Sequence, residues 1–269
     1  MPETADKKPT VMIGVPSYDG FIHNRLYEEI DALVLYSKAN GVDVFTKGHI
    51  TFIVAVCSLL PLNRRFLVDD ALKLGADYLL TIDSDTCCIP PDALVRLLAH
   101  EKDLVGAVQY KKAPPHVPLF GTFSNIDGKK MAYVVYFEPD TLLKVDGLGF
   151  GFTLISTRLL RDCLTRNPNH ELFPCSELCG EDGGFCRIIY ECGYEAYIDT
   201  GLIVGHKGDY VYGAWDASLY AKELRDLQAD GCGLTEAVKK LEVKYGSVHR
   251  GRAASCVYGL TIDELKTKG

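Results

Sequence analysis

Apolar runs and amphipathic stretches alternate along the first 110 residues of the chain. Four runs rich in aliphatic and β-branched residues have the length of strands, and they span 10–16, 50–56, 78–82 and 103–110. Three stretches between them carry apolar residues at helical spacing, at 24–40, 63–74 and 91–100. Strands that are apolar throughout are typical of a parallel sheet that is covered on both faces. The pattern therefore predicts an α/β fold with a mostly parallel central sheet and helices on both faces.

The pattern changes after a proline-rich segment at 111–118. Residues 120–137 predict an antiparallel hairpin that turns at Asp127 and Gly128. Residues 146–156 run through three glycines into a strand, and a helix follows from Thr157. Another helix is expected from near Glu181 to Gly193, and two short strands are expected within 194–208. This half predicts a small antiparallel sheet beside the central one.

These elements suggest a division of the chain without a clear linker. Residues 1–9 are polar and are expected to form a flexible leader. Residues 10–208 are expected to form the main domain, with 10–110 and 111–208 as its two halves. Residues 209–269 are expected to be a C-terminal extension that packs on the same domain through leucine and valine side chains.

Composition and charge narrow the classes of function. The net charge of −7 gives no basic surface of the kind that a non-specific nucleic-acid binder needs. No apolar stretch approaches the length of a membrane span, and no hydrophobic signal segment is present, so we expect a cytoplasmic protein. The ten cysteines are then expected to be reduced thiols. Four of them cluster at 175, 179, 186 and 192, but their spacing matches no usual zinc pattern and favours packing roles.

Two aspartates, Asp83 and Asp85, follow the apolar run at 78–82. In open α/β sheets, ligands bind beyond the carboxyl ends of the strands, and this pair is expected to lie there. Two carboxylates this close raise each other's pKa unless a cation neutralises them. Mg²⁺ or Mn²⁺, held by one or two carboxylates and by substrate phosphates, fits such a pair. A helix-capping loop before the proline-led helix at 91–100 is the alternative interpretation.

Other polar residues follow in an order that favours a site. Glu181 and Asp182 open a predicted helix, where acidic residues also simply complement the helix dipole. His206 follows a predicted strand and is open to the reading of an ordinary loop histidine. Gly149 lies within the glycine-rich segment, where backbone can approach a ligand closely or form a bulge. None of the predicted strands leads into a glycine-rich phosphate loop, which disfavours a dinucleotide-binding domain.

This order resembles the GT-A glycosyltransferases, in particular glycosyltransferase family 2, over roughly residues 10 to 208. The resemblance rests on "IGVPSYD", on Asn63-Arg64-Arg65 followed by "GADYLLTIDSD", on "GED" and on "GH". It implies a GT-A fold and a metal ion, Mn²⁺ or Mg²⁺. The residues that it assigns to the nucleotide sugar are Pro16, Ser17, Tyr18, Asp19, Arg64, Asp83, Ser84 and Gly149. It assigns the metal to Asp85, Asp83 and His206, and catalysis to Asp182 as the base with Glu181 beside it.

The chemistry of glycosyl transfer agrees with these residue types. Transfer from a nucleotide-diphosphate sugar leaves negative charge on the diphosphate, which a divalent ion offsets as a Lewis acid. The acceptor hydroxyl must lose a proton, and a carboxylate can take it. We therefore expect a metal-dependent glycosyltransferase of the hexosyltransferase type, with inversion at the sugar, and the resemblance favours a uridine-diphosphate donor.

Two other functions stay open at this stage. A sugar-phosphate nucleotidyltransferase would share the sheet and the metal aspartates, but it normally needs a glycine-rich triphosphate loop after its first strand, which "PSYDGFIHNR" lacks. A non-catalytic relative that binds nucleotide sugars would not need every acidic position. The acceptor is not readable from the sequence, so a glycan, a lipid-linked glycan, a protein and a modified nucleic-acid base all remain open.

Overall fold

A computed structural model of the chain describes residues 8–45, 52–123, 131–134, 136–167, 171–176, 180–208, 211–212 and 214–245. Its centre is an eight-stranded sheet in the order β2-β1-β4-β11-β6-β12-β9, and β3 also pairs with β1. The strands are β1 (Thr10–Ser17), β2 (Asp43–Val44), β3 (Ile53–Val56), β4 (Tyr78–Ile82), β6 (Leu104–Val108), β9 (Leu142–Val145), β11 (Phe152–Ser156) and β12 (Ala196–Ile203). Only β9 and β11 run against the others, so the central sheet is mostly parallel, as the sequence predicts.

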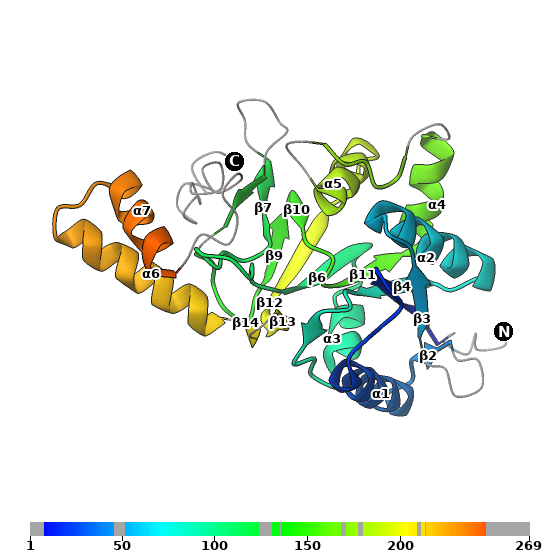
Figure 1. Ribbon diagram of the computed structural model, residues 1–269. Helices are drawn as coiled ribbons and strands as arrows, with labels where there is room; N and C mark the ends of the chain where they lie inside the picture. The colour runs from blue at the N-terminus through cyan, green and yellow to red at the C-terminus, as the bar shows by residue number, and fades with distance from the viewer. Residues whose placement is uncertain are drawn as a thin grey trace.

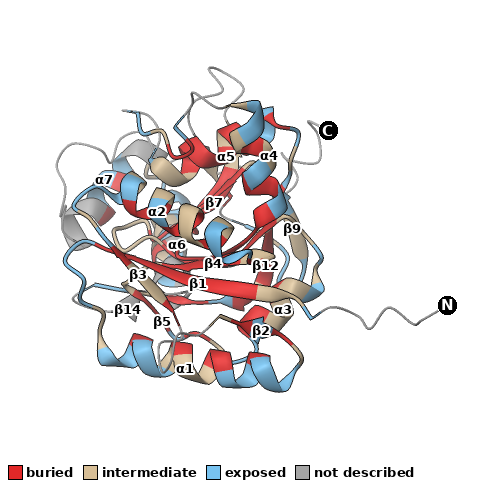
Figure 2. Ribbon diagram, turned by 90° about the vertical axis from the view of Figure 1, so that its right-hand side faces the viewer, coloured by how far each residue is buried: buried red, intermediate tan, exposed pale blue. Residues whose placement is uncertain are grey.

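Helices cover both faces of this sheet, which confirms the predicted α/β class (Figure 1). The helices of the sheet are α1 (Asn24–Ala39), α2 (Leu60–Leu74), α3 (Ala93–Ala99), α4 (Thr157–Arg166) and α5 (Glu181–Glu191). One core cluster joins the sheet to α1 and α3, and the other joins it to α2, α4 and α5. Figure 2 shows buried residues along the strands and exposed residues on the outer sides of the helices. Two further helices, α6 (Ala214–Ala229) and α7 (Leu234–Tyr245), lie to one side in Figure 1.

Two small antiparallel sheets lie beside the central one. The first has the order β10-β7-β8 and is built from β7 (Phe120–Phe123), β8 (Met131–Tyr133) and β10 (Gly147–Leu148). It contains the predicted hairpin, although the expected turn at Asp127 and Gly128 lies outside the described residues. The second has the order β14-β13-β5 and is built from β5 (Thr86–Cys87), β13 (Gly205–Lys207) and β14 (Val211–Tyr212).

Several boundaries differ from the sequence-based expectation for clear physical reasons. Helix α2 begins at Leu60, three residues before the predicted start at 63, because Pro61 fits the first turn of a helix. It ends at Gly75, which adopts the left-handed conformation with φ of 68°. Strand β11 inserts antiparallel between β4 and β6, so these two apolar strands are not direct neighbours. An apolar run indicates that a strand is buried on both faces, but it does not indicate which strand lies beside it in the sheet.

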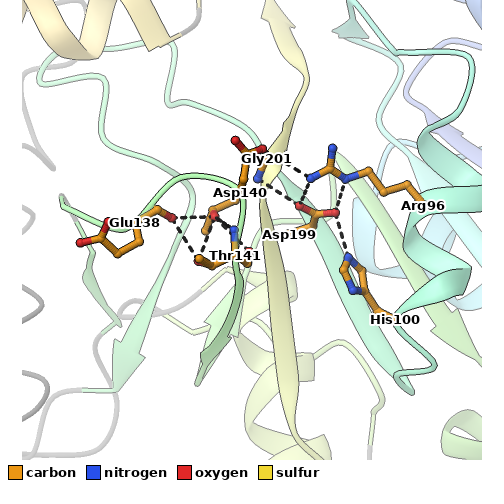
Figure 3. A network of polar contacts seen from close by, with 8 residues as sticks. Arg96, His100, Glu138, Asp140, Thr141, Asp199 and Gly201 are labelled. Atoms are coloured by element: carbon orange, nitrogen blue, oxygen red, sulfur yellow. Dashed lines mark hydrogen bonds and ion pairs between the residues drawn. The ribbon is translucent and has the colours of Figure 1, made fainter.

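A polar network connects α3 and the residue after it to β12, the strand next to the edge strand β9 (Figure 3). Asp199 on β12 is almost fully buried, and its carboxylate accepts hydrogen bonds from Arg96 at 2.5 and 2.7 Å. His100 Nε2 lies 2.9 Å from the same carboxylate, and the Gly201 amide donates to it at 3.0 Å. Burial alone would raise the pKa of Asp199, but the bonds from Arg96 and His100 outweigh it and lower the pKa. We assign this network a structural role, because it compensates a buried charge.

The cysteines of the described residues are free thiols. In the described parts of the chain, Cys186 and Cys192 are buried and Cys175 is exposed, and none of the eight described cysteines is in a disulfide. Cys179 lies outside the described residues.

No helix within the described ranges has both the length and the apolar character that crossing a membrane requires.

Candidate functional site

The two aspartates lie in the turn between β4 and β5, at the carboxyl edge of the central sheet. The Asp83 amide donates to the carbonyl of Gly151 at 3.1 Å, which continues the pairing of β4 with β11. The Thr86 amide then donates back to the Asp83 carbonyl at 2.9 Å and closes the turn. Both aspartate side chains are partly exposed. The sheet therefore places the pair where open α/β sheets bind ligands.

Asp83 is paired with a buried arginine. Arg64 comes from the first turns of α2, and its side chain is only 4% exposed. Its Nη1 lies 3.0 Å from Asp83 Oδ1, and its Nε and Nη2 each donate to Glu181 Oε1 at 3.1 Å. The guanidinium also stacks over the ring of Phe150, 5.1 Å from its centroid. One arginine thus links the end of β4 to the start of α5.

Asp85 contacts a lysine and a histidine. The ammonium of Lys112 donates to Asp85 Oδ2, and His206 Nε2 lies 3.4 Å from the same oxygen. His206 is brought there by the pairing of β13 with β5, in which residue 206 opposes Thr86. Its Nδ1 lies 2.9 Å from the carbonyl of Tyr110, which orients the ring. Burial alone would raise the pKa of Asp85, but His206 and Lys112 together lower it to about 2.

The two carboxylates are therefore each neutralised by a separate cation of the protein. This arrangement offsets the repulsion between the carboxylates of Asp83 and Asp85, because Arg64 and Lys112 approach them from different elements. The side chain of Asp83 meets Arg64, which also binds Glu181, whereas that of Asp85 meets Lys112 and His206.

The donor set around Asp85 fits a divalent cation only in part. A carboxylate oxygen and an imidazole nitrogen converge there, and both are ligands that Mn²⁺ accepts. Within the described ranges, no cluster of three histidine, cysteine or acidic side chains is close enough to hold a metal. Mg²⁺ and Mn²⁺ commonly take one or two protein ligands and complete their shell with substrate phosphates and water. Asp85 and His206 would hold such an ion, and the roles of Asp85, Asp83 and His206 as metal ligands stay predictions.

Asp182 occupies the first turn of α5 and has an unusual protonation equilibrium. Its pKa is raised to about 6, first by desolvation and then by the charge of Glu181. Arg64 and the amide of Gly183, which donates to Asp182 Oδ1 at 2.7 Å, act in the opposite direction. A carboxylate with a pKa near the working pH is suited to act as a general base.

Gly149 lies against this carboxylate. A Cβ atom at residue 149 would lie 3.1 Å from Leu119 Cβ and 3.7 Å from Asp182 Oδ2. The Gly149 amide donates to the Leu119 carbonyl at 2.7 Å, so the glycine-rich segment is held beside the start of α5. The structure therefore brings Gly149 and Asp182 together, as the sequence order implies, while contact of either with a sugar stays a prediction.

The end of β1 supplies the segment predicted to hold the nucleotide. Pro16 and Ser17 lie in β1, and Tyr18 beyond them is 75% exposed. Asp19 Oδ1 accepts from the Phe21 amide at 3.0 Å and from the Ser17 hydroxyl at 3.3 Å, which shapes the turn. The buried Asn63 donates to the carbonyls of Ser17 and Cys57 at 3.0 and 2.8 Å, and so fixes this turn relative to α2.

The sequence analysis missed two polar residues of the site. Lys112 and Gln109 both come from the end of β6, whose carboxyl end lies at the same edge as that of β4. Gln109 is buried and donates to the Thr86 hydroxyl at 3.1 Å, next to Asp85. Applying the strand-end argument to the fourth apolar run would have found both. Ser84 is partly exposed beside Asp83, and Arg65 pairs with Asp69 at 3.0 Å outside the site.

Comparisons with known proteins found distant similarity to solved structures. No protein-family model matches the chain, and no curated protein matches it. Among solved structures, A197 from STIV is 18% identical with a TM-score of 0.47, and the match covers 75% of this chain and 86% of that one. The CMP:2-keto-3-deoxy-manno-octonic acid synthetase, solved with CTP, is 12% identical with a TM-score of 0.42 over 82% of this chain and 99% of that one. Both TM-scores lie below 0.5, so neither match bears on function.

Proposed function

We propose that the protein is a glycosyltransferase that moves a sugar from a nucleotide-diphosphate donor to an acceptor hydroxyl with the help of a divalent cation. One observation supports this proposal most strongly. At the carboxyl edge of the sheet, Asp182, whose pKa is raised to about 6, follows Glu181, and Arg64 links Glu181 to Asp83 at the end of β4. Such an edge thus offers both a proton acceptor and a place for a charged diphosphate.

In this proposal the acidic residues have separate roles. Asp182 takes the proton of the acceptor hydroxyl, because its carboxylate is desolvated and its pKa is about 6. Glu181 holds the arginine of the site, since its Oε1 accepts two bonds from Arg64. Attack on the face opposite the leaving group gives inversion, which needs one base rather than two catalytic carboxylates.

The leaving diphosphate would lie near Asp85 and His206. A divalent ion bound there supplies a Lewis acid for the phosphate oxygens. The nucleotide is proposed to lie along residues Pro16 to Asp19, with the exposed ring of Tyr18 available to stack on a base. A uridine-diphosphate donor is proposed from the family resemblance alone.

Release of nucleoside diphosphate from a panel of nucleotide sugars tests the proposal. With Mn²⁺ present, the wild type is expected to hydrolyse or transfer one donor, and Asp85→Ala is expected to abolish this activity with an unchanged circular-dichroism spectrum. Asp69→Ala, which removes an exposed partner of Arg65 on α2, is the matched control and should keep full activity. Full activity of Asp85→Ala, or full activity of the wild type with a chelator, would contradict the proposal. Release of pyrophosphate from a nucleoside triphosphate would instead indicate a nucleotidyltransferase.

A further inference from the structure

The ammonium of a lysine is bound to Asp85, the carboxylate on which the proposed metal site depends. Lys112 follows β6 in the proline-rich segment, and its ammonium donates to Asp85 Oδ2. His206 Nε2 approaches the same oxygen at 3.4 Å. The side chains of Lys112 and Asp85 are each 37% exposed, so the pair is neither sealed in the core nor fully solvated.

We propose that Lys112 is a tethered cation that competes with the divalent ion for Asp85, and that binding of the ion is therefore coupled to binding of the diphosphate. The inference rests on the proposed function for the identity of the ligand, a nucleoside diphosphate. Its structural basis is that the ammonium of Lys112 and the divalent ion would both bind Oδ2 of Asp85. An ion that coordinates Asp85 through Oδ2 must displace the ammonium.

The coupling follows from the charges at this edge of the sheet. Lys112 neutralises Asp85 when no other cation is bound. Once a divalent ion replaces Lys112, both the ion and the released ammonium lie beside the single negative charge of Asp85. The neighbouring Asp83 does not offset this excess of positive charge, because its Oδ1 is already paired with Arg64 Nη1 at 3.0 Å. A diphosphate carries the negative charge that would rebalance the site. Each ligand should then raise the affinity for the other by the same factor.

The neighbouring lysine offers a matched control. Lys111 carries the same charge on the same segment, but its backbone is held by the Val117 carbonyl at 2.9 Å and by His116 Nδ1 at 3.0 Å. Lys111→Met therefore removes one positive charge near the site without removing the ammonium that contacts Asp85. A general effect of charge would appear in both variants, whereas competition for Asp85 would appear in Lys112→Met alone.

The experiment measures Mn²⁺ binding to the full chain by electron paramagnetic resonance and calorimetry, first alone and then with saturating uridine diphosphate. For the ion alone, Lys112→Met should bind about threefold to tenfold more tightly than wild type, as expected for loss of a half-exposed ion pair. Lys111→Met should match wild type. Uridine diphosphate should tighten Mn²⁺ binding several-fold more in wild type than in Lys112→Met. Lys112→Gln repeats the test with a polar side chain of shorter reach.

Three results would overturn the inference. They are unchanged or weaker Mn²⁺ binding in both Lys112 variants, an equal gain in Lys111→Met, and no detectable Mn²⁺ binding in any variant. Because no sugar donor is present, the outcome is separate from that of the proposed function. Tighter binding in Lys112→Met by a protein that turns over no donor would support the inference and contradict the glycosyltransferase proposal.

Discussion

At the scale of single residues, the site is organised by how each charge is compensated. Asp85 meets Lys112 and His206, and its pKa falls to about 2. Asp182 meets Glu181 and a desolvating environment, and its pKa rises to about 6. Carboxylates whose environments push their pKa values apart commonly divide roles between binding and proton transfer. The family resemblance assigns these two roles, but the order of residues does not predict the opposite pKa shifts, because they depend on burial and, for Asp85, on Lys112 and His206.

Replacing Asp182 with Asn should abolish transfer and stabilise the fold at high pH. The folded state holds the Asp182 proton more strongly than the unfolded chain, since the pKa is about 6 rather than 3.8. The associated stability is present at low pH and is lost as the pH rises through about 6. We expect Asp182→Asn to raise the free energy of unfolding by about 1 to 2 kcal/mol at pH 8, with a smaller gain near pH 4. Urea unfolding at the two pH values checks this, and destabilisation at pH 8 would contradict it.

The same pKa predicts how the rate depends on pH. A base must be deprotonated to accept the acceptor proton, so kcat should rise about tenfold per pH unit below the Asp182 pKa of about 6 and level off above it. Steady-state kinetics with a saturating donor measures this. A rate that falls between pH 5 and pH 7 would assign the step to a group that must be protonated.

Arg64 should be far more costly to remove than its neighbour on α2. Arg64→Met leaves Asp83 and Glu181 without their shared cation in a partly buried site, which should destabilise the fold by about 3 kcal/mol. Arg65→Met removes only a half-exposed pair with Asp69 and should cost about 0.5 kcal/mol or less. Thermal unfolding of the two variants in parallel compares them. Equal losses would mean that the buried arginine does not link β4 to α5 as described.

At the scale of elements, the apolar runs and caps predicted most of the strands and helices. β4 is found as expected at Tyr78–Ile82, and α1 begins at Asn24. The antiparallel insertion of β11 between β4 and β6 was not predictable from hydrophobicity, because a doubly covered strand reads the same in either direction. The pairing of β13 with β5 joins positions more than a hundred residues apart, and no local pattern records it.

The contact between α5 and the segment before it gives a test at this scale. A Cβ atom at Gly184 would lie 1.9 Å from the backbone carbonyl oxygen of Pro174, so Gly184→Ala must move one of these backbones. We expect a loss of about 1 to 3 kcal/mol, although alanine favours helices. Gly233→Ala, where a Cβ meets nothing within 4 Å, should cost about 0.5 to 1 kcal/mol at most, the usual cost of alanine at the start of a helix. Chemical unfolding decides between them, and a stabilised Gly184→Ala would contradict the packing.

At the scale of the whole molecule, one edge of the sheet collects the polar groups of the candidate site. Asp83 and Asp85 follow β4, Lys112 follows β6, and His206 lies on β13 beyond β12. The strand-end argument found the aspartates, and the order of motifs found Asp182 and His206. Lys112 and Gln109 follow β6, where the same strand-end argument applies, but neither belongs to a motif of the family resemblance. Their place depends on the tertiary pairing that carries β6 to this edge.

The most direct test of the account is a thermal-shift screen of nucleotide-diphosphate sugars with and without Mn²⁺. A ligand that binds only the folded state raises the unfolding temperature, and the shift grows as the ligand concentration exceeds the Kd. We expect at least one nucleotide sugar to stabilise the wild type with Mn²⁺ and far less with a chelator, and we expect Asp85→Ala to lose this shift. No shift with any nucleotide sugar, or an equal shift in Asp85→Ala, would contradict it.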